Sequence, residues 1–142
     1  MKKQNLKHLF TAALLTLVPA AAYGQDKTMT ANIPFAFRAV GSDLPAGVYK
    51  VSHGPGSAGS MSTMELQNVD TGKTVYIASA APMTEAKDGR ARITFQCVNQ
   101  QGCSLATAWS GSGSGVKFAT PPLTATQRER LETIYLKDLK QR

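Results

Sequence analysis

Histidine, cysteine and aromatic side chains are scarce in this sequence, which restricts the chemistry that it can perform. The 142 residues include two histidines, two cysteines and one tryptophan, and aromatic residues account for 7% of the chain. A catalytic triad or a zinc site needs several such side chains in one place. The calcium-loop, phosphate-loop, nucleophile-elbow and zinc-finger patterns are also missing. We therefore expect a protein that is not an enzyme and that uses neither a metal nor another cofactor.

No apolar run reaches the roughly 18–20 residues that cross a bilayer as a helix. The run from Leu9 to Ala22 follows a lysine-rich start and leads into the small-x-small sequence Ala22-Tyr23-Gly24. This order is typical of a secretory signal peptide, whereas an uncleaved membrane anchor would need a longer run. We predict a signal peptide at residues 1–24. The mature chain would begin at Gln25 and be periplasmic or extracellular, without spanning the membrane.

The positive charge of the chain is modest once this leader is set aside. Lys2, Lys3 and Lys7 contribute three of the charges in the formal net charge of +7. Residues 25–142 have the length of a single domain and are sufficient for an ordinary hydrophobic core. The remaining basic residues are scattered, and nucleic acid is not expected outside the cytoplasm. The candidate partners are an envelope polymer or an extracellular glycan.

Both cysteines lie within residues 91–110, which alternate as two strands joined by a turn at Asn99–Gly102. Antiparallel pairing of the cysteines brings the large apolar side chains to one face, with the pairs Cys97–Cys103, Phe95–Leu105, Ile93–Thr107 and Ala91–Trp109. Two cysteines in an exported protein favour a disulfide, and opposed strand residues are close enough to form one. We predict a Cys97–Cys103 disulfide at the centre of the domain, with Trp109 directed inward.

Alternating apolar residues predict further strands at residues 28–38, 48–53, 63–69, 74–80 and 116–120. Pro34 makes the first of these either an edge strand or two strands that meet at a bend. Asp70-Thr71-Gly72-Lys73 is the expected turn of a second hairpin. About seven short strands favour a mainly β fold, either a small antiparallel sandwich or a partly open barrel.

The C-terminal segment predicts one amphipathic helix at about residues 124–141. Thr126 and Glu129 have the spacing of a capping box, and Thr124 with Gln127 is an equally spaced alternative. Acidic residues near the start and basic residues near the end suit the helix dipole. The apolar stripe that would pack on the sheet consists of Leu131, Ile134, Tyr135 and Leu139.

Three segments together resemble an uncharacterised family of small exported bacterial proteins. The most specific lies in Ile33–Val51, where Pro-Phe-x-Phe is followed by Leu-Pro-Ala-Gly-x-Tyr-x-Val. The others are the Asn-x-x-Thr-Gly turn at Asn68–Gly72 and the strand pair that ends at Trp109, before a Pro-x-Thr helix start. The resemblance covers most of the mature chain and implies export and a β-rich fold. It implies no activity, cofactor or site residue, and no disulfide, since cysteines are not usual at positions 97 and 103.

Few polar residues are candidates for catalysis. His53 is the one histidine outside the leader, and it has neither a second histidine nor a free thiol as a partner, so we expect a structural role. Glu65 and Glu85 are a pair of the kind that glycosidases use, although their spacing does not single them out. A hydrolase with an unrecognised site is therefore kept as an alternative.

Tyr49, Tyr76 and Trp109 are the aromatic residues from which a sugar-stacking platform would be built. Tyr76 alternates with Val75 and Ile77 and is expected to be exposed, whereas packing is the expected role of most aromatic residues. We therefore predict an exported, non-catalytic β domain that is an envelope-associated or extracellular binding or structural module. Tyr76, Tyr49 and His53 are its candidate binding residues, and a carbohydrate-binding module is the other alternative.

Overall fold

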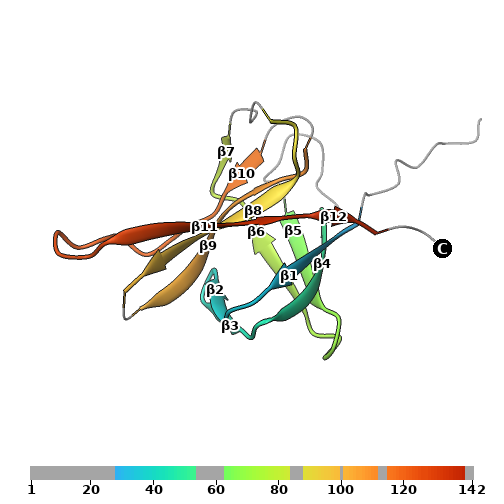
Figure 1. Ribbon diagram of the computed structural model, residues 1–142, viewed down its shortest axis with the longest axis horizontal. Helices are drawn as coiled ribbons and strands as arrows, with labels where there is room; N and C mark the ends of the chain where they lie inside the picture. The colour runs from blue at the N-terminus through green and yellow to red at the C-terminus, as the bar shows by residue number, and fades with distance from the viewer. Residues whose placement is uncertain (1–27, 54–62, 84–87, 100, 112–114, 140–142) are drawn as a thin grey trace, which may run out of the picture.

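The computed structural model describes residues 28–53, 63–83, 88–99, 101–111 and 115–139. These residues form twelve β-strands in two sheets and no helix (Figure 1). The predicted mainly β fold is confirmed, with more and shorter strands than the sequence pattern indicates. The predicted signal peptide, residues 1–24, lies outside the described residues.

The first sheet has five antiparallel strands. Their order is β12 (Lys137–Asp138), β1 (Met29–Ile33), β4 (Gly47–His53), β5 (Thr63–Asn68) and β6 (Thr74–Ala78). Buried side chains alternate with more exposed ones along β1 and β5, as the geometry of a strand with one face on the core requires. The predicted second hairpin is formed by β5 and β6, where Met64 lies opposite Ile77 and Leu66 lies opposite Val75.

The second sheet is built around β8 and β9, the strands that carry the two cysteines. Its main path is β11 (Glu129–Tyr135), β8 (Arg92–Val98), β9 (Gly102–Trp109), β10 (Gly115–Lys117) and β7 (Ala81–Met83). The short strand β2 (Phe37–Ala39) runs parallel to the start of β9, and β3 (Ser42–Leu44) pairs with β2. Residues 28–38 are thus two strands, one in each sheet, which meet at the bend beside Pro34.

One apolar core fills the space between the two sheets, which do not close into a barrel. A chain of aromatic rings crosses this core. Phe95 meets both Phe35 and Phe37 edge-on at ring distances of 5.1 Å, and Phe37 meets Tyr49 at 5.4 Å. The two phenylalanines of Pro-Phe-x-Phe and the tyrosine of Leu-Pro-Ala-Gly-x-Tyr therefore join the second sheet to the first.

The turn that follows β5 is organised by a buried asparagine. Asn68 is 4% exposed, and its Oδ1 accepts hydrogen bonds from the backbone N–H groups of Asp70 at 3.0 Å and Thr71 at 2.9 Å. The Asn68 amide also lies against Gly47, where a Cβ atom would be only 3.2 Å from Nδ2. The Asn-x-x-Thr-Gly turn and the Leu-Pro-Ala-Gly turn therefore pack together, and both need the small or amide residue found there.

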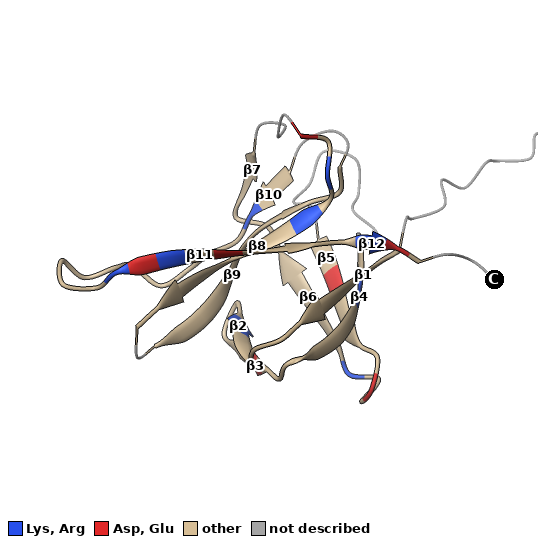
Figure 2. Ribbon diagram, viewed as in Figure 1, with Lys and Arg blue, Asp and Glu red and all other residues tan. Residues whose placement is uncertain are grey.

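The predicted C-terminal helix is wrong, because the segment forms β11 and β12 instead. Side chains alternate along it, with Glu132 and Ile134 half-buried and Leu131, Thr133 and Tyr135 exposed. β11 pairs with β8 along its whole length, and this long-range pairing outweighs the local helical pattern. Charged residues lie along β11 and β12 (Figure 2), and charges of this kind disfavour pairing of an exposed edge with another chain.

The alternative capping-box residues, Thr124 and Gln127, do contact each other, but they close a turn and do not begin a helix. Thr124 N donates to Gln127 Oε1 at 2.8 Å, and Gln127 N donates to Thr124 O at 3.0 Å. The first is one of the two contacts of a capping box, and the second is the backbone hydrogen bond of a β-turn, formed without a helix after it. The motif therefore predicted this local contact correctly, but the segment that follows is a strand and not the predicted helix.

The predicted register of the central hairpin is right near the cysteines and wrong at Trp109. Cys97 lies opposite Cys103 and Phe95 opposite Leu105, but an irregularity between Thr94 and Phe95 shifts the remaining pairs. Beyond this shift Trp109 lies opposite Arg92. Trp109 is 5% exposed, yet it lies outside the core cluster that contains Phe95. The indole is buried as expected, but on the outer face of the sheet.

Candidate functional site

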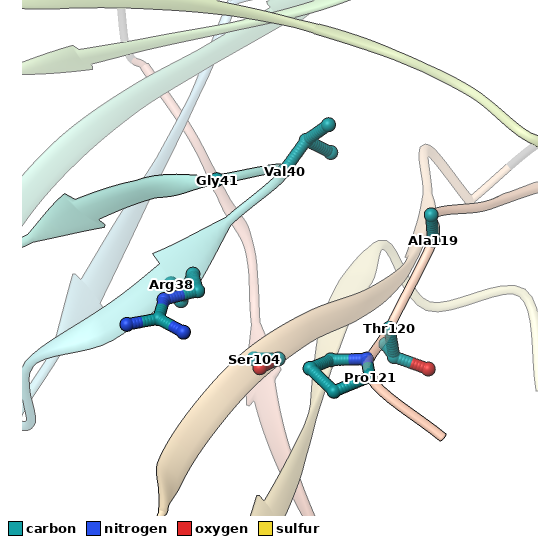
Figure 3. Close-up of a pocket in the computed structure, with 7 residues that line it drawn as sticks. All are labelled: Arg38, Val40, Gly41, Ser104, Ala119, Thr120 and Pro121. Carbon is teal, nitrogen blue, oxygen red and sulfur yellow. The ribbon is translucent and has the colours of Figure 1, made fainter.

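Two short strands share one edge of β9 and leave a gap between them. At the C-terminal part of β9, β10 pairs with it and Phe118 N donates to Ala106 O at 2.9 Å. At the N-terminal part, β2 pairs with Cys103 and Ser104. The chain after Phe118 must leave the sheet, because β2 already occupies the next positions along β9. Residues 119–121 therefore stand apart from β2 (Figure 3).

This gap is a cleft of about 500 Å³, which we name the Arg38 cleft. Its lining residues are Arg38, Val40 and Gly41 on one side, Ala119, Thr120 and Pro121 on the other, and Ser104 between them (Figure 3). The volume falls in the range of about 300–1,000 Å³ that is typical of small-molecule sites. Among the described residues, the lining combines aliphatic groups and the hydroxyls of Ser104 and Thr120 with one cation.

Arg38 is that cation, and the β2–β3 hairpin fixes its position. The hairpin register sets Arg38 opposite Asp43, and Arg38 Nε donates to Asp43 Oδ1 at 2.9 Å. This hydrogen bond, and next to it the negative charge of Asp43, raises the pKa of Arg38 above its usual value, so the guanidinium stays charged. Both side chains are exposed, so the pair adds little stability and acts by orienting the guanidinium.

Val40 occupies an unfavourable backbone conformation at the rim of the cleft. The two-residue turn between β2 and β3 has φ values of 41° at Val40 and 82° at Gly41. Asn-Gly is the usual sequence of such turns, because a β-branched residue with positive φ is strained. Val40 is also 51% exposed. A strained, exposed apolar residue beside a cleft marks the site as a functional candidate.

A smaller hollow of about 270 Å³ shares Arg38, Ser104 and Pro121 with the cleft. Gln96 lines this hollow and is 9% exposed, although it lies opposite Ser104 on the outer face of the sheet. Residues 119–121 line the cleft and residues 121–123 line the hollow, so this segment borders both.

The aromatic residues expected at a sugar platform lie in three separate places. Tyr49 is fully buried in the core, and its hydroxyl donates to Pro45 O at 2.6 Å. Tyr76 is 64% exposed and lies opposite Glu65 on the outer face of the first sheet, while Trp109 is buried on the outer face of the second. The structure therefore brings none of the three together.

Two of the predicted polar candidates, His53 and Glu65, lie in the first sheet, apart from the Arg38 cleft. His53 ends β4 and lies opposite Met64, and Glu65 lies opposite Ser52 in the same sheet. Glu85 lies outside the described residues. Within the described part of the chain, no group of three or more His, Cys, Asp or Glu residues is arranged to hold a metal ion.

Sequence reasoning missed Arg38, Val40 and Pro121 as site residues. The sequence held one usable signal, Val40-Gly41 between two strands, where a two-residue turn normally has asparagine or aspartate before the glycine. No pattern in the sequence points to Pro121, because its place in the cleft depends on where β2 meets β9.

Comparison of the chain with protein-family models, curated proteins and solved structures finds no match. The described residues include no helix of the length and apolar character needed to cross a membrane.

Proposed function

We propose that the protein is an exported, non-catalytic binding module whose ligand occupies the Arg38 cleft. The observation that carries this proposal is Val40, an apolar side chain that is kept exposed in a strained turn at the cleft rim. Backbone strain of this kind costs about 1–3 kcal/mol, and contact with a ligand is a reason for retaining it. We further propose an envelope polymer as the partner of the module, and an extracellular glycan as its partner under the carbohydrate-binding alternative given below.

The disulfide supports the export part of the proposal. The sulfur atoms of Cys97 and Cys103 are bonded at 2.02 Å. Disulfides persist in the periplasm and outside the cell and are rare in the cytosol. The leader-like order of residues 1–24 supports the same compartment.

Export predicts a specific change in mass. When the full-length chain is expressed in a bacterium and recovered from the periplasm or the medium, intact-mass spectrometry should show a chain that begins at Gln25. Blocking the export machinery should leave the leader attached. An exported product that retains Met1–Gly24 would contradict the proposed cleavage.

Replacing the strained valine should separate stability from binding. Val40→Asn should raise the free energy of unfolding by about 1 kcal/mol, because asparagine tolerates positive φ. An NMR screen of small fragments identifies ligands of the cleft as those that shift the amide signals of Gly41, Ser104 and Thr120. Val40→Asn should weaken the binding of these ligands. Val69→Asn is the matched control, since Val69 is 48% exposed in the turn after β5 and has no positive φ. It should change neither quantity.

The carbohydrate-binding alternative predicts that ligands shift other amide signals and that Val40→Asn has no effect on their binding. Tyr76 supports it, since it is the most exposed of the large apolar or aromatic side chains in the described residues. If oligosaccharides shift the amide signals around Tyr76, and Val40→Asn leaves their binding unchanged, the Arg38 cleft is not the binding site.

A further inference from the structure

We propose that the Arg38 cleft binds aliphatic monocarboxylates, with the carboxylate at Arg38 and Ser104 and the aliphatic body between Val40 and Ala119. This inference rests on the proposed function and adds the chemical class of the ligand. Two sources fit the class, a free alkanoic acid and the C-terminal residue of a peptide with an aliphatic side chain.

The carboxylate end is defined by the guanidinium. Arg38 and Ser104 are register partners on adjacent strands, so their side chains share one face of the sheet. Nε of Arg38 is occupied by Asp43, whereas one of the terminal nitrogens points toward Ser104 (Figure 3). Guanidinium groups recognise carboxylates through such N–H donors, and these charge-assisted hydrogen bonds are among the stronger ones in proteins. The Ser104 hydroxyl adds a further donor.

The aliphatic end is defined by the two walls of the cleft. Val40 projects from the β2–β3 turn, and Ala119 projects from the facing segment (Figure 3). The ring of Pro121 lies between Ala119 and Ser104 along the same wall. Among the described residues, the lining has no aromatic side chain for stacking on a sugar or a base and no carboxylate. These contacts favour a flexible or branched aliphatic group.

Asp43 keeps the guanidinium oriented before the ligand arrives. It is not among the residues that line the cleft, and its side chain is 79% exposed. Water around this exposed carboxylate reduces, but does not remove, its repulsion of a carboxylate bound to the same guanidinium. An arginine that is already held in place loses less conformational freedom on binding, which favours the complex.

The decisive experiment titrates the oxidised protein with sodium octanoate and follows the amide signals of the cleft by NMR. Octanoate should bind, whereas 1-octanol, which has the same chain without the charge, should bind at least about tenfold more weakly. Arg38→Gln should weaken the binding of octanoate by about tenfold. Arg38→Lys should lower the affinity by less, because lysine keeps the positive charge but lacks the paired N–H donors of the guanidinium. Lys73→Gln removes one exposed positive charge from the turn after β5 and should leave the affinity unchanged.

The source is distinguished by two peptides that end in valine, one with a free carboxylate and one with a C-terminal amide. Tighter binding of the free-acid peptide than of octanoate identifies a peptide C-terminus, and the reverse identifies an alkanoic acid; either result supports the proposal. Equal binding of octanoate by the wild type and Arg38→Gln, or equal binding of octanoate and octanol, overturns it. If other ligands still shift the cleft signals in a Val40-dependent way, the proposed function stands while the carboxylate assignment fails.

Discussion

Phe95→Ala should lower the free energy of unfolding by about 3–5 kcal/mol, the largest effect expected of any single substitution proposed here. Phe95 is fully buried, and its ring meets Phe35 and Phe37 edge-on. Its removal leaves a cavity at the point where the second sheet contacts the aromatic chain that leads to Tyr49. Urea denaturation of the oxidised protein, followed by far-UV circular dichroism, measures the loss.

Two further variants show whether the loss comes from the cavity. Phe95→Leu keeps most of the volume and should cost less than half as much as Phe95→Ala. Tyr76→Ala removes a large aromatic side chain that is 64% exposed, and it should change the stability by no more than about 0.5 kcal/mol. A cost for Phe95→Ala as small as that of Tyr76→Ala would mean that the aromatic chain does not hold the sheets together.

The strands that sequence reasoning predicted correctly are those with one face on the core. In β5 and β6, the alternation of Met64 and Leu66 with polar residues matches the observed burial. A strand in such a sheet cannot slip by one residue without exposing its whole apolar set, so the pattern determines the register. The turns that follow β5 and β8 were predictable for a related reason, because turn residues and strand ends constrain each other.

The C-terminal segment was predicted wrongly because the spacing of its side chains fits both a helix and a strand. Leu131, Ile134 and Tyr135 fit a helical stripe, while Glu132 and Ile134 also fit the inner face of a strand. Local propensity favours neither choice strongly, and the open edge of β8 decides between them. No local signal carries that information, because it depends on a strand more than thirty residues earlier in the sequence.

The candidate site was harder to predict than the fold, because no motif encodes it. The cleft exists because β2 and β10 meet the same edge of β9 and leave residues 119–121 outside the sheet. Sequence reasoning also placed Trp109 on the wrong face, since one irregularity beside Thr94 shifts the register of the pairs beyond it by one residue. The positions of the cleft residues and of Trp109 depend on which strands pair with β9 and in which register. Only the assembled structure defines that pairing.

Breaking the disulfide should be the second large effect, with a loss of about 2 kcal/mol and a fall in melting temperature of about 6–10 °C. Cys97 and Cys103 are six residues apart in sequence, so the bond closes a short loop across the β8–β9 hairpin. A short loop restricts the unfolded chain less than a long one, which keeps the loss moderate. Thermal unfolding with and without a reducing agent measures it.

The double variant Cys97→Ala/Cys103→Ala separates the cross-link from the packing of the sulfur atoms. Cys97 is 7% exposed and belongs to the core cluster, so alanine there also removes apolar contacts. The variant should therefore melt at or below the temperature of the reduced wild type, and the reducing agent should have no effect on it. Because the hairpin supplies the strands next to both β11 and β2, the whole second sheet should unfold with it in one transition. If reduction leaves the melting temperature of the wild type unchanged, the bond does not stabilise the central hairpin.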